Sequence, residues 1–351
     1  MKKLVSILLV VVTLALTLSL SACKKEEPTP QESPEPQEPV EKVTQGLAYE
    51  LQEDGTYLVS VGDAKKENHI VIPATYNGGA VVGIADKGFM WCFSLESIVL
   101  PDSITSIGEY AFDCCHALES IKIPNGVTSI GRYAFSACFK FTNIIIPYGV
   151  TNISDHAFSM CKGLTSVTIP DSVITIGDAA FQNCTSLKSV TIPDSVISIG
   201  EYAFEECDLR SITLGNGVTS IGFCAFYGCG YADVYITDMA AWCEISFADI
   251  FANPIGDFLY LNGTPVFDIV IPDGVTSIGR CAFRCNGSRF RSITIPASVT
   301  SIGKEALSEF ALETIRFEGT VKQWNAITFG ENWAERARAT HVICSDGTVK
   351  I

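Results

Sequence analysis

The sequence has few of the residues on which enzyme active sites depend. Histidine occurs only four times in 351 residues, and the chain has no HExxH zinc motif, no G-x-S-x-G nucleophile elbow and no Walker phosphate loop. Asp233 and Asp268 could become neighbours on a sheet face, but two aspartates without a further acid or base are weak support for catalysis. We therefore expect a protein that is not an enzyme and binds no cofactor.

Basic residues are also scarce. Lysine and arginine together number 24, against 39 aspartates and glutamates, which gives a net charge of −15. Proteins that bind nucleic acid neutralise its phosphates with a basic stripe or patch. The charge balance therefore argues against nucleic acid as a partner.

A period of 23 residues dominates the rest of the sequence. Cysteine and phenylalanine recur at this interval in two columns, each with a last step of 22 residues. The columns are Cys92, Cys115, Cys138, Cys161, Cys184, Cys207 and Cys229, and Phe112, Phe135, Phe158, Phe181, Phe204 and Phe226. A fixed period indicates one structural unit laid down repeatedly, so that equivalent side chains stack. One unit cannot bury its own apolar side, and the predicted fold is therefore a repeat solenoid.

Each coil is expected to contribute one short strand to a parallel sheet. In a typical coil, residues 187–192 alternate inward and outward as a short strand does. Pro193 removes a backbone donor and ends the strand. Gly200 permits a sharp bend, and residues 202–207 can form a short helical turn on the other side of the coil.

The coils follow the pattern I-P-x-S-V-x-S-I-G-x-x-A-F-x-x-C-x-x-L-x-S-I-x-I-P over about residues 44–351. In this the chain resembles the BspA-type leucine-rich repeats of bacterial surface proteins. The resemblance implies a right-handed leucine-rich repeat superhelix at a cell surface, and members of the family are described as adhesins or binders of host proteins. Ser154 and Ala85 depart from the pattern where glycine recurs, and Leu307 replaces a column phenylalanine.

Residues 1–22 are interpreted as a lipoprotein signal peptide, because two lysines precede an apolar run that ends in Leu20-Ser21-Ala22-Cys23. This ending resembles the lipobox of bacterial lipoproteins, and we predict lipid attachment at Cys23. The alternative is an ordinary signal peptide with an incidental cysteine. Residues 23–43 then form a disordered tether rich in Pro and Glu. The expected location is outside the cytoplasm, anchored to the bacterial cell envelope and exposed at its surface.

The array is expected to have capped ends and one irregular unit. Hairpin signals of the type N/D-G-T occur near both ends and once inside the array. The predicted parts are a capping hairpin at 44–73, coils at 74–236, an irregular coil at 237–271, further coils at 272–318 and a C-terminal cap at 319–351. The irregular coil shares W-x-x-I-[ST]-F with the C-terminal cap. We predict a short helix containing Trp242, then a hairpin at Asn262-Gly263, which together divide the array.

The irregular coil is also the predicted contact region, because the outward strand positions elsewhere are mostly Ser and Thr. The candidate binding residues are Trp242 and, beside it, Tyr231, Asp233 and Tyr235. Exposed aromatic side chains often act as binding hot spots. The other interpretation of Trp242, which we favour, is that it plugs a hydrophobic gap beside the short helix.

The cysteines are interpreted as structural. Cysteines at one position per coil have parallel Cβ vectors, whereas a disulfide needs converging ones, so we expect buried free thiols. Cys281 and Cys285 are the only close pair that could invite a metal, and no histidine or second pair accompanies them. We expect no metal site, with Cys281 facing outward and Cys285 as the displaced column cysteine.

Two function classes remain. The first is a surface-displayed module, attached to the membrane by its lipid, that binds a protein or a glycan in adhesion. The second is a structural envelope protein without a dedicated ligand. Both need display and neither needs catalysis, so the sequence does not separate them.

Overall fold

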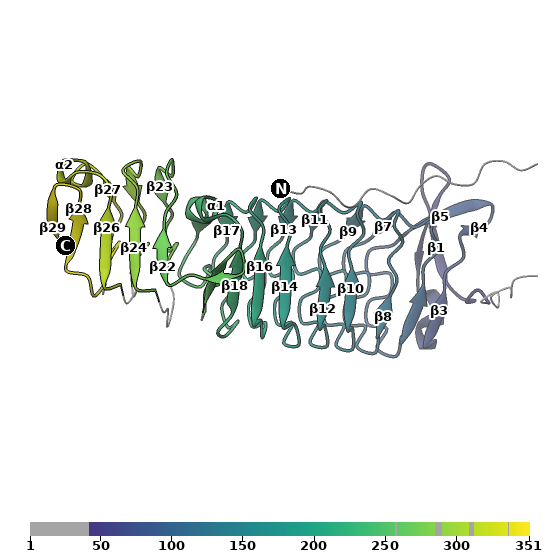
Figure 1. The fold of residues 1–351 in the computed structure, drawn as a ribbon. Helices are drawn as coiled ribbons and strands as arrows, with labels where there is room; N and C mark the ends of the chain where they lie inside the picture. Colours follow the sequence, from purple (N-terminus) through teal and green to yellow (C-terminus); the bar gives the residue numbers. More distant parts are fainter. Residues whose placement is uncertain (1–41, 257, 285–289, 309–311, 336) are drawn as a thin grey trace, which may run out of the picture. The chain divides into compact units, whose positions relative to one another are not determined.

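A computed structural model describes residues 42–256, 258–284, 290–308, 312–335 and 337–351. The coils in this part of the chain lie side by side in one row (Figure 1). The predicted signal peptide and Cys23 lie outside the described residues, as does the tether up to residue 41. None of the helices among the described residues is long and apolar enough to cross a membrane.

Each regular coil contributes one strand to a parallel sheet, which confirms the predicted solenoid. Within a strand, Val190 and Ile192 are buried while Ser189 and Thr191 are exposed. Each strand pairs with its equivalent one coil away, as Val190 does with Ile212. The strands are β3 (His69–Val71), β6 (Ser97–Val99), β8 (Ser120–Ile121), β10 (Asn143–Ile145), β12 (Ser166–Thr168), β14 (Ser189–Ile192), β16 (Ser211–Leu214) and β18 (Asp233–Ile236), and later β22 (Asp268–Val270), β24 (Ser292–Ile295), β26 (Thr314–Phe317) and β28 (His341–Cys344).

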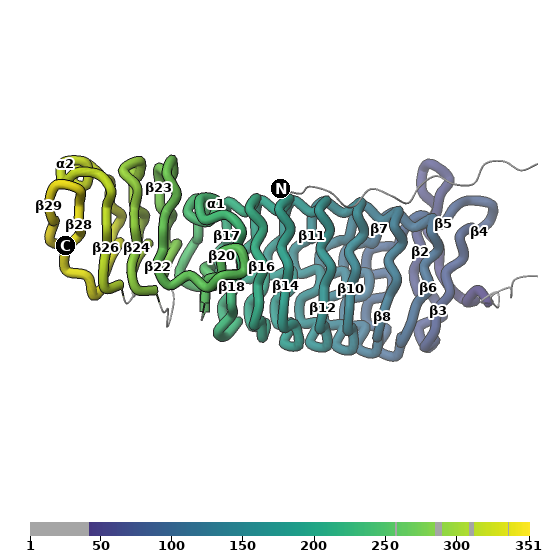
Figure 2. The backbone as a smooth tube through the Cα atoms, in the orientation of Figure 1, coloured from purple at the N-terminus to yellow at the C-terminus, as the bar shows by residue number. Residues whose placement is uncertain are grey.

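A second strand of only two residues, which the sequence does not predict, forms in each coil before the recurring glycine. These short strands also pair in parallel, as Ile176 does with Ile199. Figure 2 shows the path of the backbone through the stacked coils. They are β7 (Ser106–Ile107), β9 (Ser129–Ile130), β11 (Asn152–Ile153), β13 (Thr175–Ile176), β15 (Ser198–Ile199), β17 (Ser220–Ile221), β19 (Ser246–Phe247), β23 (Ser277–Ile278), β25 (Ser301–Ile302) and β27 (Thr328–Phe329).

The side of the coil expected to form helical turns is bonded from coil to coil instead. Tyr202 and Glu206 have φ angles of 57° and 55°, in the left-handed region, and equivalent residues repeat this in other coils. The N–H groups of Tyr202, Phe204 and Glu206 donate to carbonyls of the following coil at 2.7–2.9 Å. Stacking of neighbours therefore supplies the hydrogen bonds that a helix would have made within itself.

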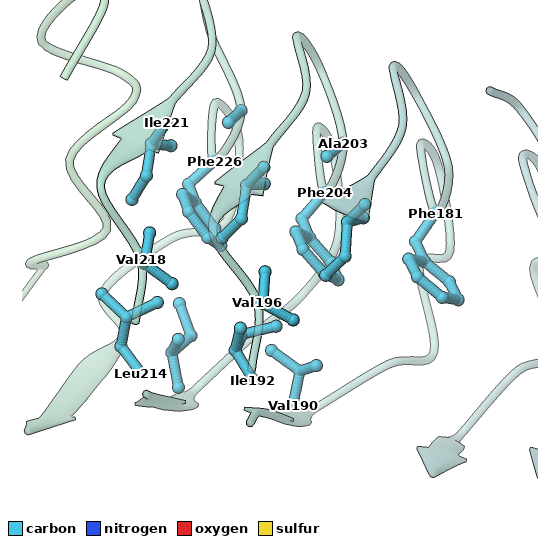
Figure 3. Close-up of a cluster of buried hydrophobic side chains, with 14 of the residues drawn as sticks. Phe181, Val190, Ile192, Val196, Ala203, Phe204, Leu214, Val218, Ile221 and Phe226 are labelled. Atoms are coloured by element: carbon cyan, nitrogen blue, oxygen red, sulfur yellow. The ribbon is translucent and has the colours of Figure 1, made fainter. Parts of the chain in front are cut away.

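The phenylalanine column forms the core. Figure 3 shows Phe181, Phe204 and Phe226 one behind the other, with Val196 and Val218 beside them. From Phe89 to Phe226, successive ring centroids lie 5.2–5.5 Å apart and the planes differ by at most 9°. Each ring therefore packs against the equivalent rings of both neighbouring coils.

The column cysteines lie in the core as free thiols. Each Sγ–H from Cys115 to Cys229 donates to a phenylalanine carbonyl of the preceding coil at 3.1–3.3 Å, as Cys161 does to Phe135. Burial raises the pKa of the Cys161 thiol to about 12. Cys281 is fully buried, so its expected outward orientation is wrong. Its carbonyl accepts a hydrogen bond from the Asn253 amide, and its thiol donates to the Glu305 carboxylate at 3.7 Å. Cys285 lies outside the described residues.

The native protein should therefore protect the column thiols from alkylation. We expect Cys115, Cys138, Cys161, Cys184 and Cys207 to react with N-ethylmaleimide only after unfolding, because burial excludes the reagent and suppresses the thiolate. Partly exposed Cys114, whose pKa burial raises to about 11, should react first among the described cysteines. Peptide mass spectrometry measures the order. Column cysteines that resist labelling even in unfolded, unreduced protein would instead be in disulfides.

Antiparallel hairpins occupy both ends of the described array. At the N-terminal end, β1 (Ala48–Leu51) pairs with β2 (Tyr57–Ser60), followed by the 3-10 helix η1 (Gly62–Lys66) and by β4 (Thr75–Tyr76) paired with β5 (Gly79–Ile84). At the C-terminal end, α2 (Val321–Trp324) precedes β28, which pairs with β29 (Gly347–Lys350). Hairpins at these positions cover the open edges of a parallel sheet.

Candidate functional site

Strand pairing in both sheets stops at the irregular unit, as it also does between β8 and β10 and between β9 and β11. The strand β18 pairs with β20 (Leu259–Leu261), which turns at Asn262-Gly263 into the antiparallel β21 (Thr264–Pro265) and ends its sheet. The short-strand sheet ends at β19 and begins again at β23. Among the described residues, no strand pairing connects the two sides. The predicted hairpin is therefore present, and it lies where strand pairing stops.

The helix α1 (Met239–Glu244) bridges this interruption. It begins at Asp238, whose Oδ1 accepts hydrogen bonds from the N–H groups of Ala240 and Ala241 at 2.7 and 3.3 Å. Near its end, the carbonyl of Cys243 accepts a hydrogen bond from the N–H of Gly279 in the next segment at 2.8 Å. The two segments are thus joined by a helix instead of by a continuous sheet.

Two side chains complete the bridge. Trp242 is 1% exposed, and its Nε1–H donates to the carbonyl of Ala282 at 3.0 Å. The amide of Asn253, also buried, donates to the carbonyls of Cys281 and Ala282 at 2.8 and 3.0 Å. A buried, internally bonded Trp242 cannot contact a partner at the surface. Its proposed role as a ligand anchor is therefore wrong, and it fills the gap beside α1.

The phenylalanine column is broken at the same place. Phe204 donates its N–H to Ala225 of the next coil, and Phe226 donates to Phe251. Phe251 therefore stands where alanine stands in the regular coil, and the fully buried Ala252 takes the place of the column phenylalanine. This exchange turns the Phe251 ring out of the core, where it is 37% exposed.

Beside the displaced ring lies a pocket of about 310 Å³, which we call the junction pocket. Three of its lining side chains are exposed aromatics: Tyr231 at 71%, Tyr227 at 41% and Phe251. Tyr227 and Phe251 meet edge to face with centroids 4.9 Å apart. The rest of the lining is Gly228, Cys229, Gly230, Asn253, Pro254, Ile255, Gly256, Phe226, Ile250 and Arg284. The guanidinium of Arg284 is paired with Glu305.

Only one of the four candidate binding residues lines this pocket. Tyr231 does, and it precedes β18. Asp233 and Tyr235 lie on the outward positions of β18, where Tyr235 stacks on Tyr260 with centroids 4.5 Å apart. Asp233 pairs in register with Ser211, whereas Asp268 belongs to the sheet beyond the interruption. The two aspartates are therefore not neighbours in one sheet.

Sequence reasoning missed Tyr227 and Phe251, although both carry a readable signal. Tyr227 occupies a position that is polar in the five preceding coils, namely Asp113, Ser136, Ser159, Gln182 and Glu205. Phe251 belongs to a Phe-Ala pair that reverses the usual Ala-Phe order. Both departures place an aromatic ring where the repeat needs none.

Comparisons with known proteins agree with the fold. A family model described as the BspA type leucine rich repeat region (6 copies) matches residues 82–207, 174–248 and 253–335. No match was found among curated proteins.

Three solved structures illustrate the similarity. A leucine rich cell surface protein from Faecalibacterium prausnitzii A2-165 is 27% identical over 83% of this chain and 98% of its own, with a TM-score of 0.40. The T. pallidum leucine rich repeat protein is 26% identical over 67% and 92%, with a TM-score of 0.39. A leucine-rich repeat protein from Bacteroides ovatus is 22% identical over 82% and 90%, with a TM-score of 0.40.

Proposed function

Because the chain belongs to the BspA-type leucine-rich repeat family, we propose that it is a non-catalytic binding module displayed at a bacterial cell surface. In this proposal the lipid on Cys23 attaches it to the membrane, and the junction pocket holds a protein or glycan partner. One observation carries the choice of site: three exposed aromatic rings, Tyr227, Tyr231 and Phe251, line one pocket. Binding residues tend to collect where irregular segments are held by a rigid scaffold.

Binding of the partner should depend on Tyr231. Replacing Tyr231 with alanine is expected to weaken partner binding on the order of 30-fold, because an exposed tyrosine at a pocket is a typical hot spot worth about 2 kcal/mol. Tyr148→Ala is the matched control, since Tyr148 is 72% exposed but lies in a regular coil. Partners captured by the full chain from envelope and host extracts, or from a glycan array, are then titrated against both variants. Equal affinities for the two variants would remove the junction pocket from the proposal.

Attachment of the protein to the membrane is expected to depend on Cys23. Cys23→Ala should release the protein into the soluble fraction, because the lipid chains, at about 0.8 kcal/mol per buried CH₂, hold it on the membrane. Fractionation followed by immunoblotting measures the distribution, with Cys114→Ala as a cysteine control that should remain in the membrane fraction. A Cys23→Ala protein that still needs detergent for extraction would contradict the lipid anchor.

The alternative is a structural envelope protein without a dedicated ligand. That function predicts no partner sensitive to Tyr231, and an envelope whose integrity depends on the amount of the protein. Envelope permeability in a deletion strain, complemented with the wild type or with Tyr231→Ala, separates the two. Full complementation by Tyr231→Ala together with failure to capture a partner would favour the structural function.

A further inference from the structure

The junction pocket carries a backbone donor that regular coils use internally. In the preceding coil, the N–H of Glu206 donates to the carbonyl of Tyr227 at 2.7 Å. One coil later the equivalent residue is Gly228, and no acceptor for its N–H exists among the described residues. The N–H of Gly230 also has no acceptor there, as is usual at this position: of the equivalent residues in regular coils, only His116 and Lys162 donate, to Cys114 and Met160.

The reason for the missing bond at Gly228 is the interruption of the array. The acceptor for the Gly228 N–H would belong to the coil that begins at Phe251. That coil does not continue the ladder, because the side chain of Asn253 bonds across to the next segment. The positive φ angles of Gly228 and Gly230, 76° and 73°, hold both residues in the loop that lines the pocket. The loop that lines the pocket therefore carries two backbone N–H groups with no acceptor among the described residues.

An acceptor lies against the same loop. The exposed side chain of Glu206 fills the space beside Gly228: a Cβ atom built on Gly228 would be 2.9 and 3.0 Å from its two carboxylate oxygens. Among the described residues, this carboxylate has no hydrogen-bond or ion-pair partner in the protein, unlike that of Glu205, which bonds to Gln182. A carboxylate in this position can accept hydrogen bonds from ligand hydroxyls.

These groups select one kind of ligand. An apolar ligand would cover the two N–H groups without bonding to them, which is costly. An anionic ligand would meet the Glu206 carboxylate on a chain of net charge −15. A pyranose ring has an apolar face that packs on aromatic side chains and hydroxyls at its edge that both accept and donate. A pocket of about 310 Å³ is at the small end of ligand sites.

We infer that the junction pocket binds a neutral sugar unit of a glycan. This inference rests on the proposed binding function and narrows its partner. One sugar face packs on Tyr231, its hydroxyl oxygens accept hydrogen bonds from the N–H groups of Gly228 and Gly230, and a hydroxyl donates to Glu206.

The test uses the purified full chain in a detergent without a sugar headgroup. An array of neutral oligosaccharides and of counterparts containing uronic or sialic acid is probed, and the affinity of each hit is measured by titration calorimetry. We expect neutral glycans to bind, and Tyr231→Ala and Glu206→Gln each to weaken them at least tenfold. Tyr148→Ala and Glu201→Gln are matched controls, because Glu201 is an exposed carboxylate in the same coil that, unlike Glu206, does not lie against Gly228.

The outcomes separate the two levels of the proposal. Binding confined to acidic glycans overturns the neutral-sugar inference, and so does neutral-glycan binding that Tyr231→Ala and Glu206→Gln leave unchanged. An array without hits, combined with a protein partner that Tyr231→Ala releases, overturns the sugar inference and leaves the proposed function in place. Absence of any Tyr231-dependent partner overturns both.

Discussion

Replacing Phe158 with alanine is expected to lower the free energy of unfolding by about 3 to 5 kcal/mol. The side chain is fully buried in the middle of the column. Its ring centroid lies 5.5 Å from that of Phe135 and 5.4 Å from that of Phe181. The truncation leaves a cavity between two rings that the neighbouring coils hold in place, so the column cannot collapse to fill it.

Chemical denaturation followed by circular dichroism measures the loss. Phe93→Ala is the control, because Phe93 is the same residue type at a position 56% exposed, and we expect it to change stability by less than about 0.5 kcal/mol. A Phe158→Ala protein with the denaturation midpoint of the wild type would mean that the phenylalanine column does not carry the core.

The repeat made the regular coils predictable from the sequence. Phe158 and Cys161 each have equivalents in the other coils. The burial of a position that is ambiguous in one coil can therefore be predicted once the same residue type recurs in every coil. The left-handed conformations of Tyr202 and Glu206 could not be found in this way, because ordinary side chains rarely adopt positive φ. Their stability comes from hydrogen bonds to the next coil, which exist only once the coils are stacked.

The site was predictable only in part. Tyr231 was identified from its place beside the irregular coil, and the helix and hairpin followed from motifs shared with the C-terminal cap. The burial of Trp242 depends on Ala282, forty residues further along the chain, and no local pattern gives that contact. The expected proximity of Asp233 and Asp268 assumed a continuous sheet, which the hairpin at Asn262-Gly263 ends.

The largest effect at the interruption is expected from Trp242→Ala, which should cost about 3 to 5 kcal/mol and uncouple the two segments. In a solenoid each coil is stabilised by its neighbours, so weakening one interface lets the array unfold in two parts. With the ring gone, the hydrogen bonds left across the bridge among the described residues are those of the Asn253 amide and the one from the Gly279 N–H to the Cys243 carbonyl. We expect denaturation in two steps, with the shorter C-terminal segment unfolding first.

Trp242→Phe separates the ring from its hydrogen bond. The carbonyl of Ala282 still accepts a hydrogen bond from Asn253 at 3.0 Å, so it is not left unpaired, and this variant should lose only about 1 kcal/mol and unfold in one step. Trp91→Ala, at a tryptophan 51% exposed in a regular coil, controls for loss of the residue type. Hydrogen exchange locates the early step: in Trp242→Ala, β24 should exchange before β14, whereas in the wild type the two should differ less. A single cooperative transition in Trp242→Ala at the wild-type midpoint would show that the segments are held together without the tryptophan.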